Sequence, residues 1–337
     1  MLFGWYNQAI MQQTVLSGIR ATGRLHLGNY LGAVKGMLAL QEDPDITTFF
    51  MVADVHTITT PYDIAELRVN RREVIIDYLA AGLDPERSTL FLQSMVGEHL
   101  ELAFLFSSVM SIARMQHLPT FKDKVKQYPD YATMALLQYP ILMAADILLY
   151  RANLVPVGID QEPHLEVARQ VARKMNETYS TNFPEPTRFA TKGEYVPSLQ
   201  GAGKMSKSVA GSFINLTDSE EEILDRLKAA PTDSGQGTLE AMPQGVKNLL
   251  QFVFLFQGVE KKSEYEAAYQ GKGVRYGDLK VALAKSIAAE LQPLQEKRRE
   301  LESNPKFVAE VIATGAAKAR VVARDTLEKV KEKMGLG

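Results

Sequence analysis

Cysteine is absent from this chain of 337 residues, and the formal net charge at pH 7 is only −2. Without cysteine there can be no disulfide, no cysteine-ligated zinc and no iron–sulfur cluster. This composition is compatible with a cytoplasmic protein. The balance of charges excludes a uniformly basic nucleic-acid binder but leaves room for local basic patches. No apolar run approaches the roughly 20 residues of a membrane span, so we expect no membrane association.

The first residues also lack the features of a secretory signal. Residues 1–6 have neither a basic region nor a long apolar stretch. Met11 is a second candidate start, so we treat 1–13 as a leader of uncertain status. The one tryptophan, Trp5, falls in this leader.

Apolar residues make up 46% of the sequence, enough for a large core, and the length favours two domains. Over 14–210, short apolar stretches alternate with stretches of helical periodicity. The expected strands are 14–19, 47–54, 89–93 and 153–158, and the expected helices are 30–41, 66–82, 98–114, 132–151 and 163–179, with 121–126 as an exposed basic connector. This alternation predicts an α/β fold with a Rossmann-like, doubly wound parallel sheet and a site at the carboxyl ends of its strands.

Helical periodicity dominates from 211 to 337. The expected helices are 218–230, 246–256, 261–269, 279–299 and 307–334, which predicts an all-helical second domain whose last helix packs back on the first. Residues 272–337 hold fourteen Lys and Arg against nine Asp and Glu. A polyanion partner would fit this excess. On charge alone, however, a solvated helical surface is the commoner explanation.

Two polar loops attract attention. Lys204-Met205-Ser206-Lys207-Ser208 follows three small residues, 201–203, and the glycines favour a mobile loop. Two ammonium groups three residues apart suit a triphosphate, although a solvated surface loop is the alternative. The second loop, His26-Leu27-Gly28-Asn29, lies between the first strand and a helix, where helix N–H groups bind anions. The glycine spacing is not GxGxxG, so a dinucleotide fold of that kind is not indicated.

Together these loops resemble the HIGH and KMSKS signatures of class I aminoacyl-tRNA synthetases. Other stretches are similar to tryptophanyl-tRNA synthetases, and the resemblance extends over 15–336. These stretches are 17–18, 54–59, 143–148, 155–158, 160–161, His164 and 232–235. The resemblance implies a cytoplasmic homodimer with a catalytic domain at 14–210 and a helical domain at 211–337 that contacts the tRNA anticodon.

The resemblance also implies an ATP site. His26 and Asn29 would bind the phosphates, Gly28 would leave room for adenine, and Lys124, Lys204 and Lys207 would hold the pyrophosphate. Mg²⁺ is expected on the phosphates, without protein side chains as metal ligands and without zinc. Arg20 stands where many members of the family carry Gln. The full set of implied ATP-binding positions is Arg20, Ala21, Thr22, Gly28, Asn29, Gly158, Ile159, Asp160, Val196, Lys204, Met205, Ser206, Lys207 and Ser208.

Asp146 is the candidate for amino-acid recognition, because a carboxylate in the apolar run 141–149 is costly unless it has a partner. Indole N–H is a donor only, so this acceptor would discriminate against phenylalanine. The alternative is a buried Asp that satisfies local structure or pairs with an arginine. The other implied tryptophan-binding residues are Tyr139, Met143, His56, Gln161, Val155 and Val157; for Tyr139 and Met143, ordinary core packing is the alternative.

The implied reaction has two steps. L-tryptophan and ATP give tryptophanyl-adenylate and pyrophosphate, and the tryptophanyl group then passes to the terminal adenosine of tRNA(Trp). Three rivals remain: a tyrosyl-tRNA synthetase, a catalytically silent paralogue that binds tryptophan or RNA as a regulator, and a small-metabolite nucleotidyltransferase. The stretches 143–148 and 160–164 argue against the first, and intact His26, Lys204 and Lys207 argue against the second. The long helical domain argues against the third.

Overall fold

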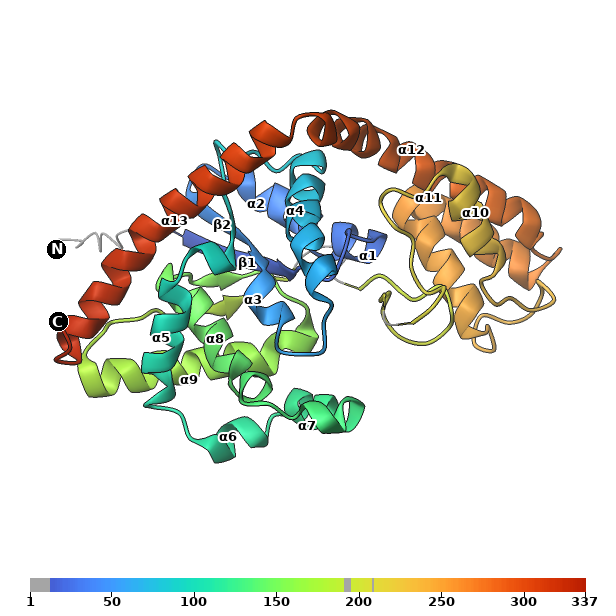
Figure 1. Ribbon diagram of the computed structural model, residues 1–337. Helices are drawn as coiled ribbons and strands as arrows, with labels where there is room; N and C mark the ends of the chain where they lie inside the picture. The colour runs from blue at the N-terminus through green and yellow to red at the C-terminus, as the bar shows by residue number, and fades with distance from the viewer. Residues whose placement is uncertain (1–12, 191–194, 208) are drawn as a thin grey trace, which may run out of the picture.

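A parallel sheet of five strands, in the order β3-β2-β1-β4-β5, organises the protein (Figure 1). The computed structural model describes residues 13–190, 195–207 and 209–337. Ser208 and, except for Gln13, the predicted leader therefore lie outside the described residues. The strands are β1 (Gln13–Arg20), β2 (Ile46–Ala53), β3 (Thr89–Leu92), β4 (Leu154–Val155) and β5 (Thr187–Arg188). The predicted doubly wound α/β fold is confirmed.

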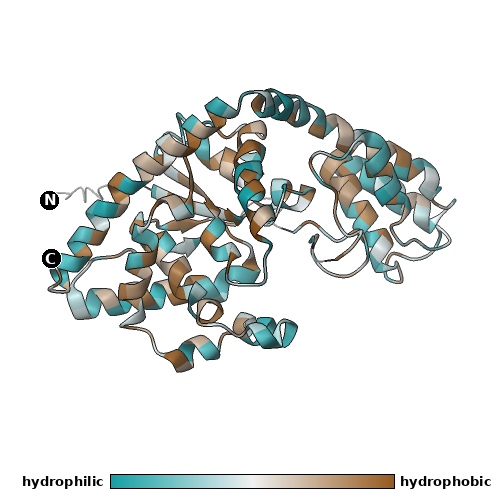
Figure 2. Cartoon of the chain, viewed as in Figure 1, coloured by the Kyte–Doolittle hydropathy of each residue, from teal (hydrophilic) through white to brown (hydrophobic). Residues whose placement is uncertain are grey.

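Both faces of the sheet are buried under helices. Alternate residues of a strand point to opposite faces; Val15 and Phe50 belong to one apolar core, whereas Leu16 and Phe49 belong to the other. The first core includes α2 (Lys35–Gln41), α4 (Ile64–Ala80) and α12 (Tyr276–Ser303), and the second includes α5 (Glu98–Ser107), α8 (Met134–Leu149), α9 (Glu162–Tyr179) and α13 (Pro305–Lys333). Figure 2 shows apolar residues concentrated on the strands and on the inner sides of the helices.

Several short elements differ from the prediction. The helix expected at 98–114 is two helices, α5 and α6 (Ile112–Gln116), because the Ser111 side chain caps α6 by accepting from the Arg114 N–H. The basic connector expected at 121–126 lies inside α7 (Pro119–Gln127), which starts with a proline at its first turn. Strand β4 has only two residues, and β5 was not predicted.

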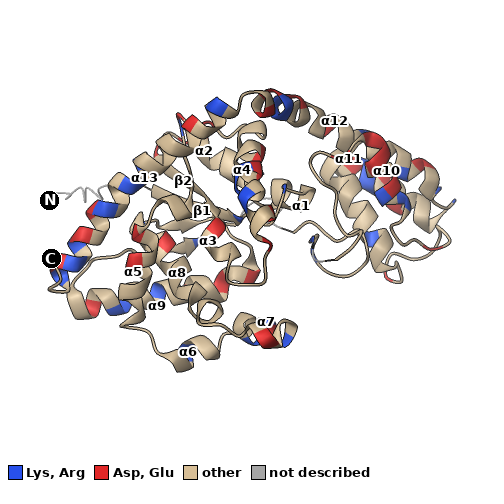
Figure 3. Ribbon diagram, in the orientation of Figure 1, with Lys and Arg blue, Asp and Glu red and all other residues tan. Residues whose placement is uncertain are grey.

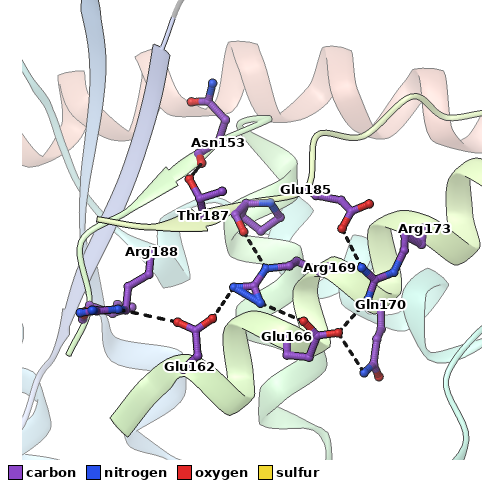
Figure 4. Close-up of polar contacts among 11 residues, drawn as sticks. Asn153, Glu162, Glu166, Arg169, Gln170, Arg173, Glu185, Thr187 and Arg188 are labelled. Carbon is purple, nitrogen blue, oxygen red and sulfur yellow. Dashed lines mark hydrogen bonds and ion pairs between the residues drawn. The ribbon is translucent and has the colours of Figure 1, made fainter. Parts of the chain in front are cut away.

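Between the strands and these helices lie α1 (Leu27–Asn29), a π-helical turn (Tyr30–Val34) and α3 (Asp54–Thr57). Three-residue 3-10 turns are Gln93–Met95, Pro129–Tyr131 and Ile159–Gln161. A series of ion pairs holds helix α9 beside β5 (Figure 4). Arg169 pairs with Glu162 and Glu166, and its Nε donates to the Pro186 carbonyl oxygen at 3.0 Å. These pairs fix the start of α9.

The second half of the chain is helical. It contains α10 (Glu220–Lys228) and α11 (Gln244–Gln270), which joins two predicted helices across a break at Gly258 (φ 92°). Helix α12 leads from these helices back to the sheet, and α13 then runs along the sheet (Figure 1). A Cβ at Gly315 would overlap the Leu90 carbonyl oxygen, so glycine permits the close crossing of α13 over β3. No helix among the described residues is long and apolar enough to cross a bilayer.

Candidate active site

A cavity of about 390 Å³ opens at the carboxyl ends of β1, β2 and β4. It lies where the strand order changes direction between β1 and β4, which is where ligands bind in open α/β sheets. The structure brings all seven predicted amino-acid-binding residues to its wall. They are His56, Tyr139, Met143, Asp146, Val155, Val157 and Gln161, and Arg20 and Lys124 also line it.

The Asp146 carboxylate, on α8, is buried, and both of its oxygens have polar partners. Its Oδ2 lies 2.7 Å from His56 Nε2, and its Oδ1 accepts from Gln93 Nε2 at 2.8 Å and lies 2.6 Å from His99 Nδ1. Burial alone would raise the pKa of Asp146. His56 and His99 oppose this effect through their charges and hydrogen bonds, and they lower the pKa to about 2. Asp146 is therefore ionised at neutral pH. Because each carboxylate oxygen can accept two hydrogen bonds, Oδ2 retains one acceptor position.

A second polar chain crosses the cavity wall from α8 to α9. Gln161 Oε1 can only accept, so His164 Nδ1, 3.0 Å away, carries the proton of the neutral ring. His164 Nε2 is then an acceptor, with the Thr120 hydroxyl at 2.7 Å and the Tyr139 hydroxyl at 2.6 Å. Burial lowers the pKa of His164 to about 4; Asp160 opposes this shift and His56 adds to it. Tyr139 and Met143 are one helical turn apart and so lie on the same side of α8.

Two cations stand at the rim of the cavity. Arg20, the last residue of β1, donates from Nη2 to Thr60 Oγ1 at 2.8 Å. Arg20 Nε is buried and has no hydrogen-bond partner within the described part of the chain. Lys124 on α7 has a pKa lowered by burial and by the charge of Arg20. Neither cation forms an ion pair with another described residue, and two such cations at one rim favour an anion between them.

The His26 loop is held by a reciprocal cap. Asn29 N donates to His26 Nδ1 at 3.3 Å, and His26 N donates to Asn29 Oδ1 at 3.2 Å. Burial and the charges of Lys207 and Lys204 lower the pKa of His26 to about 4. The neutral ring therefore carries its proton on Nε2, as a donor. A Cβ at Gly28 would lie 2.9 Å from the His26 ring, so this close packing requires glycine.

The lysine loop, 204–207, lies against the His26 loop because their flanking segments pair. Leu27 N donates to Ile214 O at 2.8 Å, and Leu216 N donates to Leu25 O at 3.2 Å. Met205 is buried between the two loops, where the Gly28 N–H points to its Sδ at 3.2 Å. Both lysines of this loop are thus close enough for their charges to act on the neutral His26 ring.

The other predicted ATP-site residues surround these loops. The Lys207 ammonium donates to the Arg24 carbonyl oxygen, and Lys204 Nζ would be 3.6 Å from a Cβ on Gly158. The Val196 carbonyl oxygen accepts from Met205 N at 2.9 Å, and Ser206 N donates to Ser212 Oγ at 3.4 Å. Ala21 is buried and Thr22 is exposed; Ile159 and Asp160 are exposed in the turn after Gly158.

Sequence reasoning did not single out Gln93, His99 or Thr120. Gln93 and His99 complete the Asp146 site, and Thr120 Oγ1 accepts from the Tyr139 hydroxyl at 2.9 Å. The position of Gln93, a polar residue at the end of an apolar strand, could have identified it as a site residue. Nothing in the local sequence identifies His99 or Thr120, because both reach the site only through the packing of α5 and α7.

Comparisons with known proteins agree with this geometry. The model of the family described as tRNA synthetases class I (W and Y) matches residues 11–292. The tryptophan–tRNA ligase of Helicobacter pylori is 41% identical over 331 residues, which are 96% of this chain and 99% of the relative. That of Porphyromonas gingivalis is 38% identical over 327 residues, again with 96% and 99% coverage.

Solved structures give the same picture. The tryptophanyl-tRNA synthetase of Campylobacter jejuni, complexed with ADP and tryptophan, has a TM-score of 0.83 at 33% identity, covering 96% of this chain and 100% of that chain. The tyrosyl-tRNA synthetase of Archaeoglobus fulgidus, with a TM-score of 0.66 at 20% identity, shares the fold and covers 85% of this chain and 90% of its own. This chain therefore belongs to the tryptophan–tRNA ligase family of the class I tRNA synthetases.

Proposed function

We propose that this enzyme activates L-tryptophan with ATP and transfers the tryptophanyl group to the 3′-terminal adenosine of tRNA(Trp). The observation that carries this proposal is the ionised Asp146 carboxylate in the wall of a largely apolar cavity. A phenylalanine side chain has no donor for that acceptor. Lys204 of the lysine loop lies close to Gly158, which follows Val157 of that wall. Family membership and the relatives named above support the same substrate.

In the proposed complex, the indole lies between Val155 and Val157 on one side and Met143 on the other. Its N–H donates to the remaining acceptor position of Asp146 Oδ2. The tryptophan ammonium lies near the Tyr139 hydroxyl and Gln161, and its carboxylate lies at the rim between Arg20 and Lys124. Burial and the charge of Arg20 lower the pKa of Lys124, and an anion between these cations would relieve their repulsion.

ATP is proposed to lie over the His26 loop. The Nε2–H of His26 would donate to a phosphate oxygen, and Lys204 and Lys207 would hold the β- and γ-phosphates. Among the described residues, no group of three or more His, Cys, Asp or Glu side chains could hold a metal ion. We propose that Mg²⁺ arrives on the ATP phosphates. The other positions in 20–22, 158–160, 196 and 204–208 would surround the nucleotide.

In the first step, a tryptophan carboxylate oxygen forms a bond to the α-phosphorus of ATP while the bond to the pyrophosphate oxygen breaks. The attacking carboxylate is already a nucleophile and needs no general base. Catalysis is then positioning of the two reactants plus stabilisation of charge on the leaving pyrophosphate, for which the loop supplies two ammonium groups. In the second step, the 2′-hydroxyl of the tRNA adenosine attacks the acyl carbon and AMP leaves.

The wider assembly belongs to the same proposal. Residues 14–210 would form the catalytic domain and 211–337 the tRNA-binding domain, with α13 packed on the sheet. Leu100 and Phe104 lie one turn apart on α5 and are 53% and 75% exposed; a homodimer would cover them. Charges of both signs are mixed along α10, α12 and α13 (Figure 3), so a tRNA contact would depend on local groups of basic residues. We propose a cytoplasmic location, where tRNA charging takes place.

Amino-acid-dependent ATP–pyrophosphate exchange tests the proposed activity. We expect exchange with tryptophan alone among the twenty amino acids. Exchange with tyrosine would instead identify a tyrosyl-tRNA synthetase. A folded sample without exchange, yet with measurable tryptophan binding, would indicate a silent paralogue. Aminoacylation of tRNA(Trp) transcripts then tests the second step.

A further inference from the structure

Arg298, on α12, is buried although it lies in a strongly charged stretch of sequence. Its exposed fraction is 2%, and that of its partner Asp77 on α4 is 0%. The Arg298 guanidinium donates to Asp77 Oδ1 and to Glu73 Oε2, and its Nε lies 3.1 Å from Glu302 Oε1. A buried charge without a partner is costly, so Asp77 and Arg298 depend on each other.

The second oxygen of Asp77 holds the His26 loop. Asp77 Oδ2 accepts from the Leu25 backbone N–H at 2.6 Å, and Leu25 immediately precedes His26. This donor is the N–H of an irregular segment, so it has no helix or strand partner. Asp77 therefore fixes the backbone position from which the His26 ring and the first turn of α1 begin.

The same group of charges reaches the lysine loop. Glu73 Oε2 also accepts from Arg24 Nε at 2.8 Å, and the Lys207 ammonium donates to the Arg24 carbonyl oxygen. The Asp77 charge acts on Lys207 as well, where it opposes the lowering of the lysine pKa that burial causes. One arginine on α12 thus connects, through two carboxylates on α4, to both loops of the candidate ATP site.

We propose that Arg298 is a positioning residue for ATP: it orients Asp77 so that the Leu25 N–H places His26 for the phosphates. This inference rests on the proposed function. It also means that α12, which follows α10 and α11 in the chain, contacts the His26 loop through Asp77 (Figure 1). Burial raises the pKa of Asp77 to about 6, against the opposing charge of Arg298 and the Leu25 hydrogen bond. Loss of the guanidinium would therefore favour a protonated, reoriented Asp77.

Arg298→Met tests the proposal, with Arg299→Met as the matched control, because Arg299 is the next residue and is exposed. We expect Arg298→Met to raise the KM for ATP in pyrophosphate exchange at least tenfold and to lower kcat. The Kd for tryptophan without ATP, from equilibrium dialysis, should change less than twofold. Arg299→Met should match the wild type in all three quantities.

Two further variants keep the test informative if Arg298→Met folds poorly. Arg298→Lys retains one charge but cannot bridge two carboxylates, so we expect an intermediate KM for ATP. Arg298→Met combined with Asp77→Leu removes the unpaired charge and should restore folding but not the KM for ATP. Equal losses in tryptophan and ATP affinity, or wild-type kinetics in folded Arg298→Met, would overturn the inference. A wild-type enzyme without tryptophan-dependent exchange would instead refute the proposed function.

Discussion

Nδ1 of His99 lies 2.6 Å from Asp146 Oδ1, and Nε2 of the same ring lies 2.8 Å from the Tyr150 hydroxyl. The carboxylate only accepts, so Nδ1 carries the proton and, in the neutral ring, Nε2 accepts from Tyr150. Asp146 therefore sets the tautomer of His99, and the Tyr150 hydroxyl, outside the cavity wall, holds the direction of the ring. Burial, with Asp146 and Glu98, raises the pKa of the Tyr150 hydroxyl well above its usual range.

Tyr150→Phe removes only this hydroxyl. We expect about a fivefold loss in kcat/KM for tryptophan, because one neutral hydrogen bond contributes about 1 kcal/mol. The KM for ATP should not change. Tyr179→Phe, on α9 and away from the Asp146 chain, serves as the control. A loss shared equally between the two substrates would argue against a role through His99.

Asp146→Asn removes the charge but keeps the size of the side chain. We expect the KM for tryptophan to rise at least tenfold, because the amide presents a donor as well as an acceptor to His56, Gln93 and His99. ATP binding, measured by calorimetry without tryptophan, should stay intact. Unchanged tryptophan kinetics would mean that Asp146 is structural.

Lys207→Ala should slow adenylate formation far more than it weakens tryptophan binding in the absence of ATP. The ammonium would act on the departing pyrophosphate, whose charge grows only as the reaction proceeds. Single-turnover measurements in a rapid-quench instrument separate the two quantities, with exposed Lys122→Ala as the control. If both quantities fall together, Lys207 supports the loop rather than the leaving group.

Stability should fall between pH 6.5 and pH 4. His26 and His164 have pKa values of about 4 in the folded protein, below the usual 6.5, so the unfolded chain binds more protons in this window. Each contributes a slope of up to about 1.4 kcal/mol per pH unit, with stability lost as the pH falls. Asp77 has a raised pKa in the folded protein, so between about pH 6 and pH 4 it adds stability as the pH falls and partly offsets the loss from the histidines.

Urea unfolding at several pH values measures this slope. His26→Asn should reduce it, since the unfolded chain then has one fewer proton to gain. Gln116→Asn, an exposed substitution that changes no titratable group, should leave the slope as it is in the wild type. A wild-type slope in His26→Asn would mean that His26 takes up its proton in the folded protein as well.

The long elements of the fold were predictable from sequence because β1 and β2 contain short apolar runs and α13 repeats apolar residues at helical spacing. Strand β4 lies inside the strand predicted at 153–158, whereas β5, with two residues, is too short to give a signal. The Asp146 site was predictable in part, because a carboxylate in an apolar run needs a partner. The partners of Asp146 were not predictable, because Gln93 and His99 belong to other elements that tertiary packing brings to α8.

Arg298 illustrates a signal that was present in the sequence. Within the charged stretch 296–300 it looks like a surface residue, yet Leu291, Leu294, Arg298 and Leu301 recur at helical spacing and are all buried. The period places Arg298 on the apolar side of α12 and Arg299 outside it. Which acid it meets depends on α4, more than 200 residues away, and local sequence carries no information on that pairing.

The pairing of Leu27 with Ile214 and of Leu25 with Leu216 has a consequence for the growing polypeptide. On the ribosome, strand β1 emerges early, but the turn that follows it lacks its backbone partners until some 190 further residues have been made. Such non-local contacts form late in folding. A chain cut just before residue 211 would therefore retain most of the sheet and leave the His26 loop without its backbone partners.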